Sequence, residues 1–336
     1  MLEKEVGRMT VILLFGSLLF ILGGAVLFTN GVEWLGKKFN LNEGTVGSVL
    51  AAVGTALPET MIPIIAILFG TGADAHAIGV GAILGAPFML STIAMFLAGL
   101  SALAFKRREN RRELAVNGEV FKRDLTFFLP FYALALLASF LPYAGKVIVA
   151  LVLVGAYAYY LKITITAPAG EENCHELDRC YFAPRHDDPP TLAIIAQVLV
   201  ALTMIVLGAD EFVKGIETAA KAAGIPPLVL SLVIAPIATE LPEKFNSIIW
   251  IRDQKDTYAL GNITGAMVFQ STLIPAFGIV FSDWHLDFYA GLSGILALTA
   301  GLLAYLGYRW QKKLSARLLL INGLLYLVFI YFVVRG

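Results

Sequence analysis

Two glutamates that each follow a proline stand inside long apolar stretches of the sequence. Pro58-Glu59 lies in G-T-A-L-P-E-T at 54–60, and Pro242-Glu243 lies in A-T-E-L-P-E-K at 238–244. A proline inside a helix leaves backbone carbonyls without partners, which an apolar medium tolerates only where something polar binds them. Open carbonyls beside carboxylates form an all-oxygen ligand set that suits a hard cation such as Ca²⁺. The motifs therefore predict a cation site, and two structural glutamates that cap neighbouring helices are the alternative.

The composition places these motifs in a membrane protein. Of 336 residues, 58% are hydrophobic and only 15% are charged, against about 25% charged in a typical soluble domain. The formal net charge is zero, so no imbalance indicates nucleic acid. The first apolar run, 10–28, is longer than the apolar region of a typical signal peptide and is interpreted as a retained span.

Runs of about 20 apolar residues predict the membrane spans. Two connections are long, the basic 106–124 and the polar 166–190; neither resembles a folded domain, and we expect the basic one to be a solvated cytoplasmic loop. The ten predicted spans lie near 10–31, 44–70, 76–105, 125–142, 144–165, 191–213, 227–251, 258–282, 286–308 and 315–334.

The basic residues predict the orientation, because cytoplasmic loops carry an excess of Lys and Arg. With the N-terminus outside, the inner connections hold 17 basic residues and the outer set holds six. We therefore expect a multi-pass plasma-membrane protein with both termini extracytoplasmic.

The two motifs belong to an internal repeat. An offset of 184 residues places 25–59 on 209–243 with 11 of 35 positions identical, and an offset of 180 places 77–92 on 257–272 with six identities. Each copy holds five spans, and an odd number makes the second copy enter the membrane from the opposite side, as in secondary transporters. We expect an all-α integral membrane fold of ten helices in two inverted five-helix repeats, 1–165 and 191–336, joined by a polar cytoplasmic loop at 166–190.

The repeated motif, followed by G-A-I-L-G-A at 81–86 and G-N-I-T-G-A at 261–266, resembles the two signature repeats of the cation/calcium exchanger superfamily, which includes the sodium/calcium exchangers. The resemblance covers nearly the whole chain. It implies an antiporter of ten or eleven spans that exchanges Ca²⁺ against Na⁺, K⁺ or H⁺ by alternating access. The ligands that it implies here are Glu59, Glu243, Thr55, Thr239 and Asn262.

The sequence departs from the family pattern in both repeats. Ala82 stands where the family usually has Asn or Asp, and Asn262 stands where sodium/calcium exchangers often carry an acid. The second repeat instead adds Glu240 and Lys244, which stand at i and i+4. Either Glu240 is a cation ligand and Lys244 points away, or Lys244 neutralises Glu240 and leaves Glu59 and Glu243 for the ion; we favour Glu240 in the site.

Other features carry weaker hypotheses. Asp210 and Glu211 are expected to funnel cations or to anchor a helix at the interface. Cys174 and Cys180 are expected to be free thiols, with a metal clip or a disulfide as the alternative. The G-L-S-G at 291–294 matches an intramembrane protease motif, but no histidine follows His285 to activate the serine. Hydroxyl and amide side chains beyond the glycine-rich motifs are expected to line the pathway or to bond between helices; they are Ser91, Thr92, Gln270, Ser271 and Thr272.

These observations predict a transporter rather than an enzyme. We expect an antiporter that exchanges Ca²⁺ or a related divalent cation for Na⁺, with an H⁺-coupled exchanger as the alternative and an intramembrane enzyme as a remote one. Its partners are inorganic cations and the lipid bilayer, with no nucleic acid and no cofactor. The expected site residues are Glu59, Glu243, Thr55, Thr239, Glu240 and Asn262.

Overall fold

The computed structural model describes residues 2–38, 57–70, 73–106, 108–166 and 178–335, and these ranges are mostly helical. Apolar segments in a bilayer must bond their backbone groups internally, which a helix does. The elements in chain order are α1 (Leu2–Lys38), α4 (Leu57–Leu68), α5 (Ala73–Met89), η2 (Leu90–Ala94), α6 (Met95–Ala104), β1 (Glu113–Leu114), α7 (Gly118–Leu137), η3 (Ala138–Phe140), α8 (Tyr143–Ile165), α9 (Thr191–Ala223), α10 (Pro227–Arg252), α11 (Asp256–Phe281), α12 (Phe288–Gln311), β2 (Leu314–Ser315) and α13 (Ala316–Arg335).

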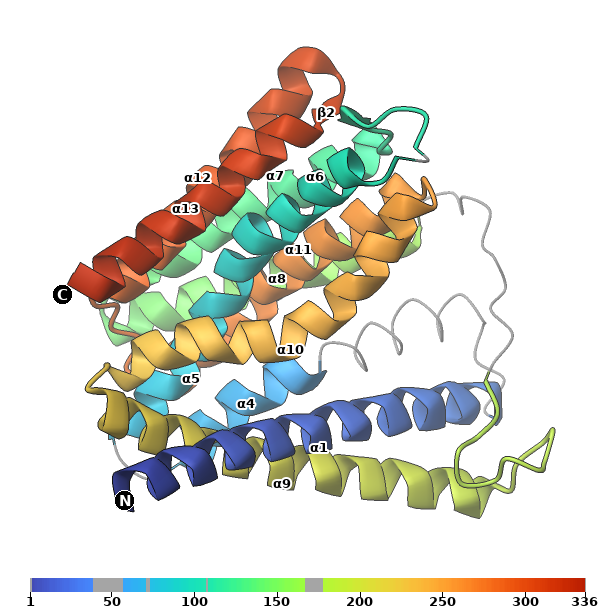
Figure 1. The fold of residues 1–336 in the computed structure, drawn as a ribbon, viewed down its shortest axis with the longest axis vertical. Helices are drawn as coiled ribbons and strands as arrows, with labels where there is room; N and C mark the ends of the chain where they lie inside the picture. Colours follow the sequence, from blue (N-terminus) through green and yellow to red (C-terminus); the bar gives the residue numbers. More distant parts are fainter. Residues whose placement is uncertain (1, 39–56, 71–72, 107, 167–177, 336) are drawn as a thin grey trace.

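The predicted helical membrane architecture is confirmed. Eight helices within the described ranges are long and apolar enough to cross a membrane, and two shorter apolar helices, Pro58–Leu68 and Pro227–Glu240, fall in the second and seventh predicted spans. The second predicted span, 44–70, lies partly outside the described residues. The free ends of α1 and α13 lie at the same end of the bundle (Figure 1), as an even number of crossings requires.

Two of the helical paths deviate from a straight α-helix. Residues 73–104 run through α5, the π-helical turn η2 and α6 as one continuous path. Helix α10 stays helical through Pro236 and Pro242 and bends near its middle (Figure 1). The prolines of the second repeat therefore lie within a continuous, bent helix and do not interrupt it, as is general for proline kinks.

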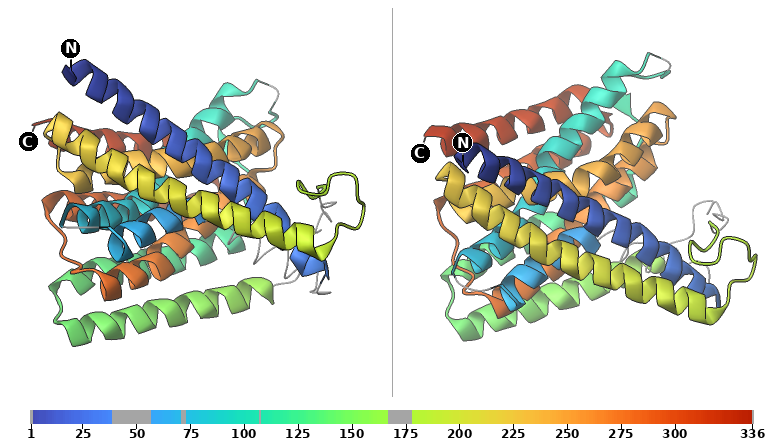
Figure 2. Two further views of the ribbon diagram at one scale, coloured as in Figure 1. Left: turned by 90° about the horizontal axis from the view of Figure 1, so that it is seen from below. Right: turned by 60° about the horizontal axis from the view of Figure 1, so that its bottom comes forward.

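Helices α1 and α9 lie side by side across one side of the molecule (Figures 1 and 2). Glycines allow their backbones to approach closely. A Cβ atom on Gly24 would lie 2.8 Å from Cγ1 of Ile205, and one on Gly208 would lie 2.8 Å from Cγ1 of Ile21. The two contacts are reciprocal, because positions 24 and 208 differ by 184, as do positions 21 and 205.

A second pair of contacts along the same helices repeats this relation. A Cβ atom on Gly31 would lie 2.7 Å from Cγ2 of Val198, and one on Gly215 would lie 2.7 Å from Cδ2 of Leu14. These positions again differ by 184. Helices α1 and α9 therefore contact each other through equivalent surfaces, as two copies related by a pseudo-two-fold axis would.

Helix α5 is held closely against the first half of α10. A Cβ atom on Gly81 would overlap the carbonyl oxygen of Leu228, and one on Gly85 would lie 2.6 Å from Cγ of Pro236. The hydroxyl of Ser231 donates to the carbonyl of Ile78 at 2.7 Å. The glycine-rich motif of the first repeat is thus packed directly on the helix that carries the second Pro-Glu motif.

The described part of the polar connection, 178–190, is packed on α1 and α9. Asn30 and Trp34 of α1 both donate to the carbonyl of Asp178, at 3.2 and 3.0 Å. Gln197 of α9 donates to Asn30 at 2.9 Å and accepts the thiol of Cys180 at 3.3 Å. Cys180 is a free, buried thiol; Cys174 lies outside the described residues.

The basic connection differs from the solvated loop that we expected. Helix α7 already begins at Gly118, and Glu113 and Leu114 form a short antiparallel pair with β2. Arg108 is only 6% exposed and pairs with Asp256 at the start of α11. Its side chain is buried because a carboxylate and the carbonyl of Ile251 accept its hydrogen bonds, which a count of basic residues does not reveal.

Candidate cation site

Glu59 stands in the first turn of α4, which begins at Leu57. Proline is tolerated at this end of a helix because its missing N–H would have no partner there. A carboxylate is favoured at the same end by the helix dipole. The Pro-Glu motif thus begins a helix in the first repeat, and the Glu59 side chain is buried there, 8% exposed.

Glu59 shares a pocket with the threonine of the second repeat. The pocket lies between α4, α5 and α10 and is otherwise apolar, and its lining residues are Glu59, Ile62, Ala82, Ala86, Ala235, Pro236 and Thr239. The hydroxyl of Thr239 donates to the carbonyl of Ala235 one turn earlier, at 3.0 Å. The hydroxyl oxygen keeps its capacity to accept, so it can serve as a ligand.

The added acid and base of the second repeat form an ion pair. Lys244 Nζ lies 3.5 Å from Oε2 of Glu240, and both side chains are 1% exposed. Lys244 therefore lies against Glu240 rather than pointing away. Both carboxylate oxygens of Glu240 are buried without a hydrogen bond from the described residues, so the ion pair leaves ligand capacity on this carboxylate.

Asn262 of α11 contacts α10 closer to the C-terminal end of α10 than the Glu240–Lys244 pair. Its side-chain nitrogen donates to the hydroxyl of Ser247 at 3.4 Å, and Ser247 is 2% exposed. Sequence reasoning overlooked Ser247, because the equivalent position of the first repeat is Pro63 and no repeated motif marks it. A serine two turns after the repeated threonine was the available signal.

These contacts gather on one face of α10. Positions 239, 240, 244 and 247 fall within a sector of about 140° at about 100° per residue. The nine residues from Thr239 to Ser247 are eight helical steps and span about 12 Å along the helix. One face of α10 therefore meets the Glu59 pocket, carries the ion pair and meets Asn262.

Two of the predicted site residues cannot be placed. Thr55 lies outside the described residues, and nothing is described of the side chain of Glu243, although α10 includes it. Among the groups that the structure does describe, no three acidic, histidine or cysteine side chains gather at one point. The structure brings Glu59 together with Thr239, Glu240 with Lys244, and Asn262 with Ser247.

Comparison with known families decides what kind of protein carries this arrangement. A family model described as sodium/calcium exchanger protein matches residues 9–166 and 193–335. The chain belongs to this family. It is a multi-pass membrane transporter that handles inorganic cations, and it is not an enzyme. The two matched ranges leave out most of the polar connection at 166–190 that we expected between the repeats.

Relatives of this exchanger-family chain match over most of its length. CaxA of Alkalimonas amylolytica, which is named as a candidate antiporter, is 25% identical over 304 residues, 88% of each chain. The inner membrane protein YrbG of Escherichia coli is 22% identical over 280 residues, 82% of this chain and 81% of its own. The resemblance to the cation/calcium exchanger superfamily that the sequence motifs indicated is therefore confirmed.

Solved exchanger structures share the fold. The H⁺/Ca²⁺ exchanger CAX superposes with a TM-score of 0.71 at 19% identity, over 96% of this chain and 82% of that one. The sodium-calcium exchanger NCX_Mj superposes with a TM-score of 0.56 at 19% identity, over 96% and 97%. At this level of identity the likeness concerns the fold alone.

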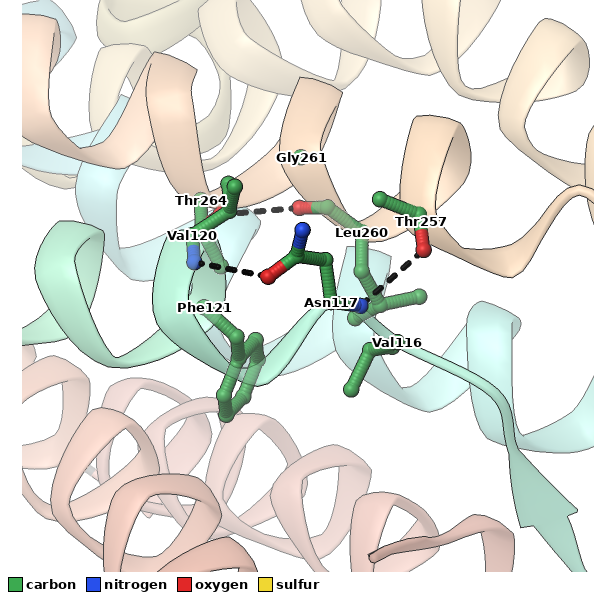
Figure 3. A pocket seen from close by; sticks show the side chains of 8 residues that line it. All are labelled: Val116, Asn117, Val120, Phe121, Thr257, Leu260, Gly261 and Thr264. Atoms are coloured by element: carbon green, nitrogen blue, oxygen red, sulfur yellow. Dashed lines mark hydrogen bonds between the residues drawn. The ribbon is translucent and has the colours of Figure 1, made fainter. Parts of the chain in front are cut away.

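A second pocket of this exchanger-family chain lies between α7 and α11 (Figure 3). Its lining residues are Val116, Asn117, Val120, Phe121, Thr257, Leu260, Gly261 and Thr264. The Asn117 side chain accepts from Val120 N, and its backbone N–H donates to the Thr257 hydroxyl (Figure 3). None of these described lining residues is acidic, although the Thr264 hydroxyl donates to the buried carboxylate of Asp124 at 2.7 Å.

Most hydroxyls beyond the glycine-rich motifs bond within their own helices. Ser91 and Thr92 donate to the carbonyl of Phe88, and Ser271 and Thr272 donate to that of Val268. The bonds that these four hydroxyls donate therefore run within a helix rather than between helices, because a helical Ser or Thr can reach the carbonyl one turn back. That they line the pathway stays a prediction. Gln270 is buried with no hydrogen bond from the described residues.

The remaining polar motifs also find local partners. Lys214 pairs with Asp210 at 2.7 Å and with Glu211 at 2.9 Å, and all three side chains are exposed. Lys214 reduces the formal charge of the two carboxylates from −2 to −1, which weakens the attraction that a funnel for cations would need. The ion pairs agree better with a helix anchor at the membrane interface. Ser293 of the protease-like motif is buried and donates to Ala290 of its own helix at 2.8 Å.

Proposed function

We propose that the chain is a secondary antiporter that exchanges Ca²⁺, or a related divalent cation, for Na⁺ at a site beside α10. The observation that carries this proposal is that Glu59 of the first repeat and Thr239 of the second line one pocket. Family membership supports a cation transporter. The buried carboxylate supplies the charge, and the oxygen atoms around it suit a hard cation.

The proposed ligand set combines both repeats. Glu59, Thr239 and Glu240 come from described side chains, and Asn262 completes the set through the α10–α11 contact. Thr55 and Glu243 are included because of the internal repeat. The equivalent residues of the other copy, Thr239 and Glu59, line the pocket. Position 243 follows position 239 by four residues on α10. At about 100° per residue it therefore falls in the same sector of the helix as the other proposed ligands.

The proposed charge of the site matches a divalent cation. Glu59, Glu240, Glu243 and Lys244 sum to −2 when all four are ionised. One Ca²⁺ or two monovalent cations would balance this charge. Because Ca²⁺ and Na⁺ would use the same oxygens, each would exclude the other, and exchange would follow without any covalent chemistry.

Alternating access would come from the two long helices. Helices α1 and α9 are 37 and 33 residues long and pack on each other through equivalent surfaces. We propose that they slide as a pair against the rest of the bundle and expose the site to each side in turn. Each net charge moved would contribute about 2.3 kcal/mol per 100 mV of membrane potential.

The proposed setting completes this mechanism. The protein would lie in the plasma membrane with both termini extracytoplasmic, as the distribution of Lys and Arg indicates. Its repeats would be 1–165 and 191–336, with 166–190 as the cytoplasmic connection. Residues 178–190, packed on α1 and α9, would then bind the two sliding helices at their cytoplasmic ends.

An H⁺-coupled exchanger is the second candidate. The observation that favours it is the buried Glu240 carboxylate, one helical turn from Glu243 in sequence. Like charges this close resist ionising together, so a cation that binds can displace a proton. Na⁺ and H⁺ coupling then differ only in which monovalent cation occupies the carboxylates when Ca²⁺ leaves.

Uptake into proteoliposomes tests both candidates. Radioactive ⁴⁵Ca²⁺ should accumulate when a Na⁺ gradient is imposed; accumulation with a pH gradient alone would instead establish H⁺ coupling. Glu59→Gln should abolish uptake, whereas Glu119→Gln, at an exposed position of α7, should leave it intact. Uptake that survives Glu59→Gln would show that the site is elsewhere.

A further inference from the structure

A lysine is buried in the part of α10 that carries the proposed ligands. Lys244 is 1% exposed, and its Nζ lies 3.5 Å from Oε2 of Glu240. Lysine is almost never fully buried unless it is paired, so the carboxylate of Glu240 compensates the ammonium here. The pair brings a fixed positive charge to the helix face that also carries Thr239.

The pair occurs in one repeat only. At the 184-residue offset, Lys244 corresponds to Thr60, and Glu240 corresponds to Ala56. Both charges are present together in the second repeat and absent together from the first. Relative to the shared Pro-Glu motif they add no net charge, although they add a cation and an anion at specific places.

Glu240 also has ligand capacity that Lys244 does not use. Both of its oxygens are buried and receive no hydrogen bond from the described residues. A buried carboxylate normally accepts several hydrogen bonds. With the ammonium facing Oε2, the other oxygen remains open to a transported cation.

We propose that Lys244 is a tethered cation that takes the place of one transported monovalent cation beside Glu240. The inference rests on the proposed function. An ammonium group and a bound Na⁺ both place a single positive charge against carboxylate oxygens. Because the ammonium is fixed to α10, it cannot leave with the coupling ions, and each Ca²⁺ is exchanged for one fewer of them.

A purely structural pair would behave differently. Glu240 and Lys244 flank Pro242, where the helix lacks a backbone hydrogen bond, so the pair could simply hold the bend together. In that role the charge of Lys244 would affect folding and rate but not the number of ions that are exchanged. The stoichiometry of exchange therefore distinguishes the two roles.

The variants change the charge of the site in defined steps. Lys244→Met and Lys244→Gln lower the formal charge from −2 to −3, and Lys244→Arg keeps it at −2. The double variant Glu240→Gln/Lys244→Met removes both charges and restores −2. Lys244→Gln also keeps a hydrogen-bond donor against Glu240, so it remains informative where the methionine variant does not fold.

The measured quantity is the Ca²⁺ gradient at which net Ca²⁺ flux into proteoliposomes stops. The membrane potential is held at zero and a fixed Na⁺ gradient is imposed. If the wild type is H⁺-coupled, a fixed pH gradient replaces the Na⁺ gradient. We expect both neutral variants to use one more monovalent cation per Ca²⁺ than the wild type. With a Na⁺ gradient of about tenfold, one more Na⁺ raises the balancing Ca²⁺ gradient about tenfold. The arginine and double variants should keep the wild-type value.

The matched control is Lys214→Met, which neutralises an exposed lysine paired at i and i+4 with Asp210 and should keep the wild-type stoichiometry. An unchanged stoichiometry in Lys244→Gln overturns the inference. Failure of the proposed function looks different: the wild type would not exchange Ca²⁺ at all, or Glu59→Gln would leave exchange intact.

Discussion

Both terminal nitrogens of the Arg108 guanidinium bind Asp256, one to each carboxylate oxygen, at 2.7 and 2.6 Å. The backbone N–H of Ala115 donates to the same carboxylate at 2.8 Å. The connection after α6 is thereby fastened to the first residue of α11. Asn262 follows six residues later on α11, about 9 Å along the helix, so this pair helps to position a proposed ligand.

Arg108→Ala should strongly destabilise the protein. The Arg108 and Asp256 side chains are 3% and 1% exposed, and removal of one partner of a buried pair costs about 3–5 kcal/mol because the other charge stays uncompensated. Thermal unfolding in detergent measures the effect. Arg252→Ala, which breaks the exposed pair with Asp253, is the control and should barely shift Tm. Equal shifts in both variants would contradict a buried role for Arg108.

Gly24→Ala should weaken the α1–α9 contact. The added Cβ would lie 2.8 Å from Cγ1 of Ile205 and 3.0 Å from the carbonyl of Ala201, and such overpacking costs about 1–3 kcal/mol. We expect a lower Tm and slower ⁴⁵Ca²⁺ uptake. Ile205→Ala should partly restore both in the double variant. Gly16→Ala, where the new Cβ meets no atom within 4 Å, is the control; a loss as large as that of Gly24→Ala would refute close packing as the cause.

Much of this architecture could be predicted from sequence because lipid imposes a simple rule on long apolar runs. The predicted spans 144–165 and 315–334 agree with α8 and α13 almost to the residue. The repeat offset of 184, found from identities such as Pro58 with Pro242, recurs in the reciprocal contacts of Gly24 and Gly208. Periodicity, span length and an internal repeat are local signals that tertiary contacts did not override.

The contacts that the sequence could not predict depend on approach in three dimensions. In the sequence, Arg108 is one of several basic residues in a polar connection. Only the folded chain shows that the turn between α10 and α11 places Asp256 against it. Ser247 became relevant only because α11 places Asn262 beside it. The pairing of Glu240 with Lys244 was left open, because Pro242 lies between them and the bend could have turned either side chain away.

Cys180 should report the integrity of the packing between 178–190 and the two long helices. Its thiol is buried against Gln197, which also accepts from Phe182 N at 2.9 Å. Loss of such hydrogen bonds, each worth about 1 kcal/mol, favours local opening. In a Cys174→Ser background, Gln197→Ala should therefore raise the rate of maleimide labelling at Cys180 by about tenfold. Mass spectrometry of the labelled protein provides the rate, and Thr203→Ala, at an exposed site on α9, is the control. Rapid labelling of Cys180 in the protein that retains Gln197 would contradict the burial of this thiol.

Ala82 offers the most direct gain-of-ligand test of the pocket. It lines the same pocket as Glu59 and Thr239, and the family resemblance implies Asn or Asp at this position. Ala82→Asp would add a fourth carboxylate and take the formal site charge from −2 to −3. We expect tighter Ca²⁺ binding and one more monovalent cation exchanged per Ca²⁺, whereas Ala82→Asn should tighten binding without a change in stoichiometry.

Initial rates of ⁴⁵Ca²⁺ uptake at varied Ca²⁺ concentration measure the first effect as a lower KM, and the balancing gradient measures the second. Ala82→Val is the control: it fills part of the same pocket without an oxygen ligand, so its KM should rise. If Ala82→Asp and Ala82→Val weakened Ca²⁺ transport equally in folded protein, the pocket would be a packing defect rather than a binding site. A lower KM in the aspartate variant alone would place the transported ion within reach of α5, on the side where the first repeat has lost its ligand.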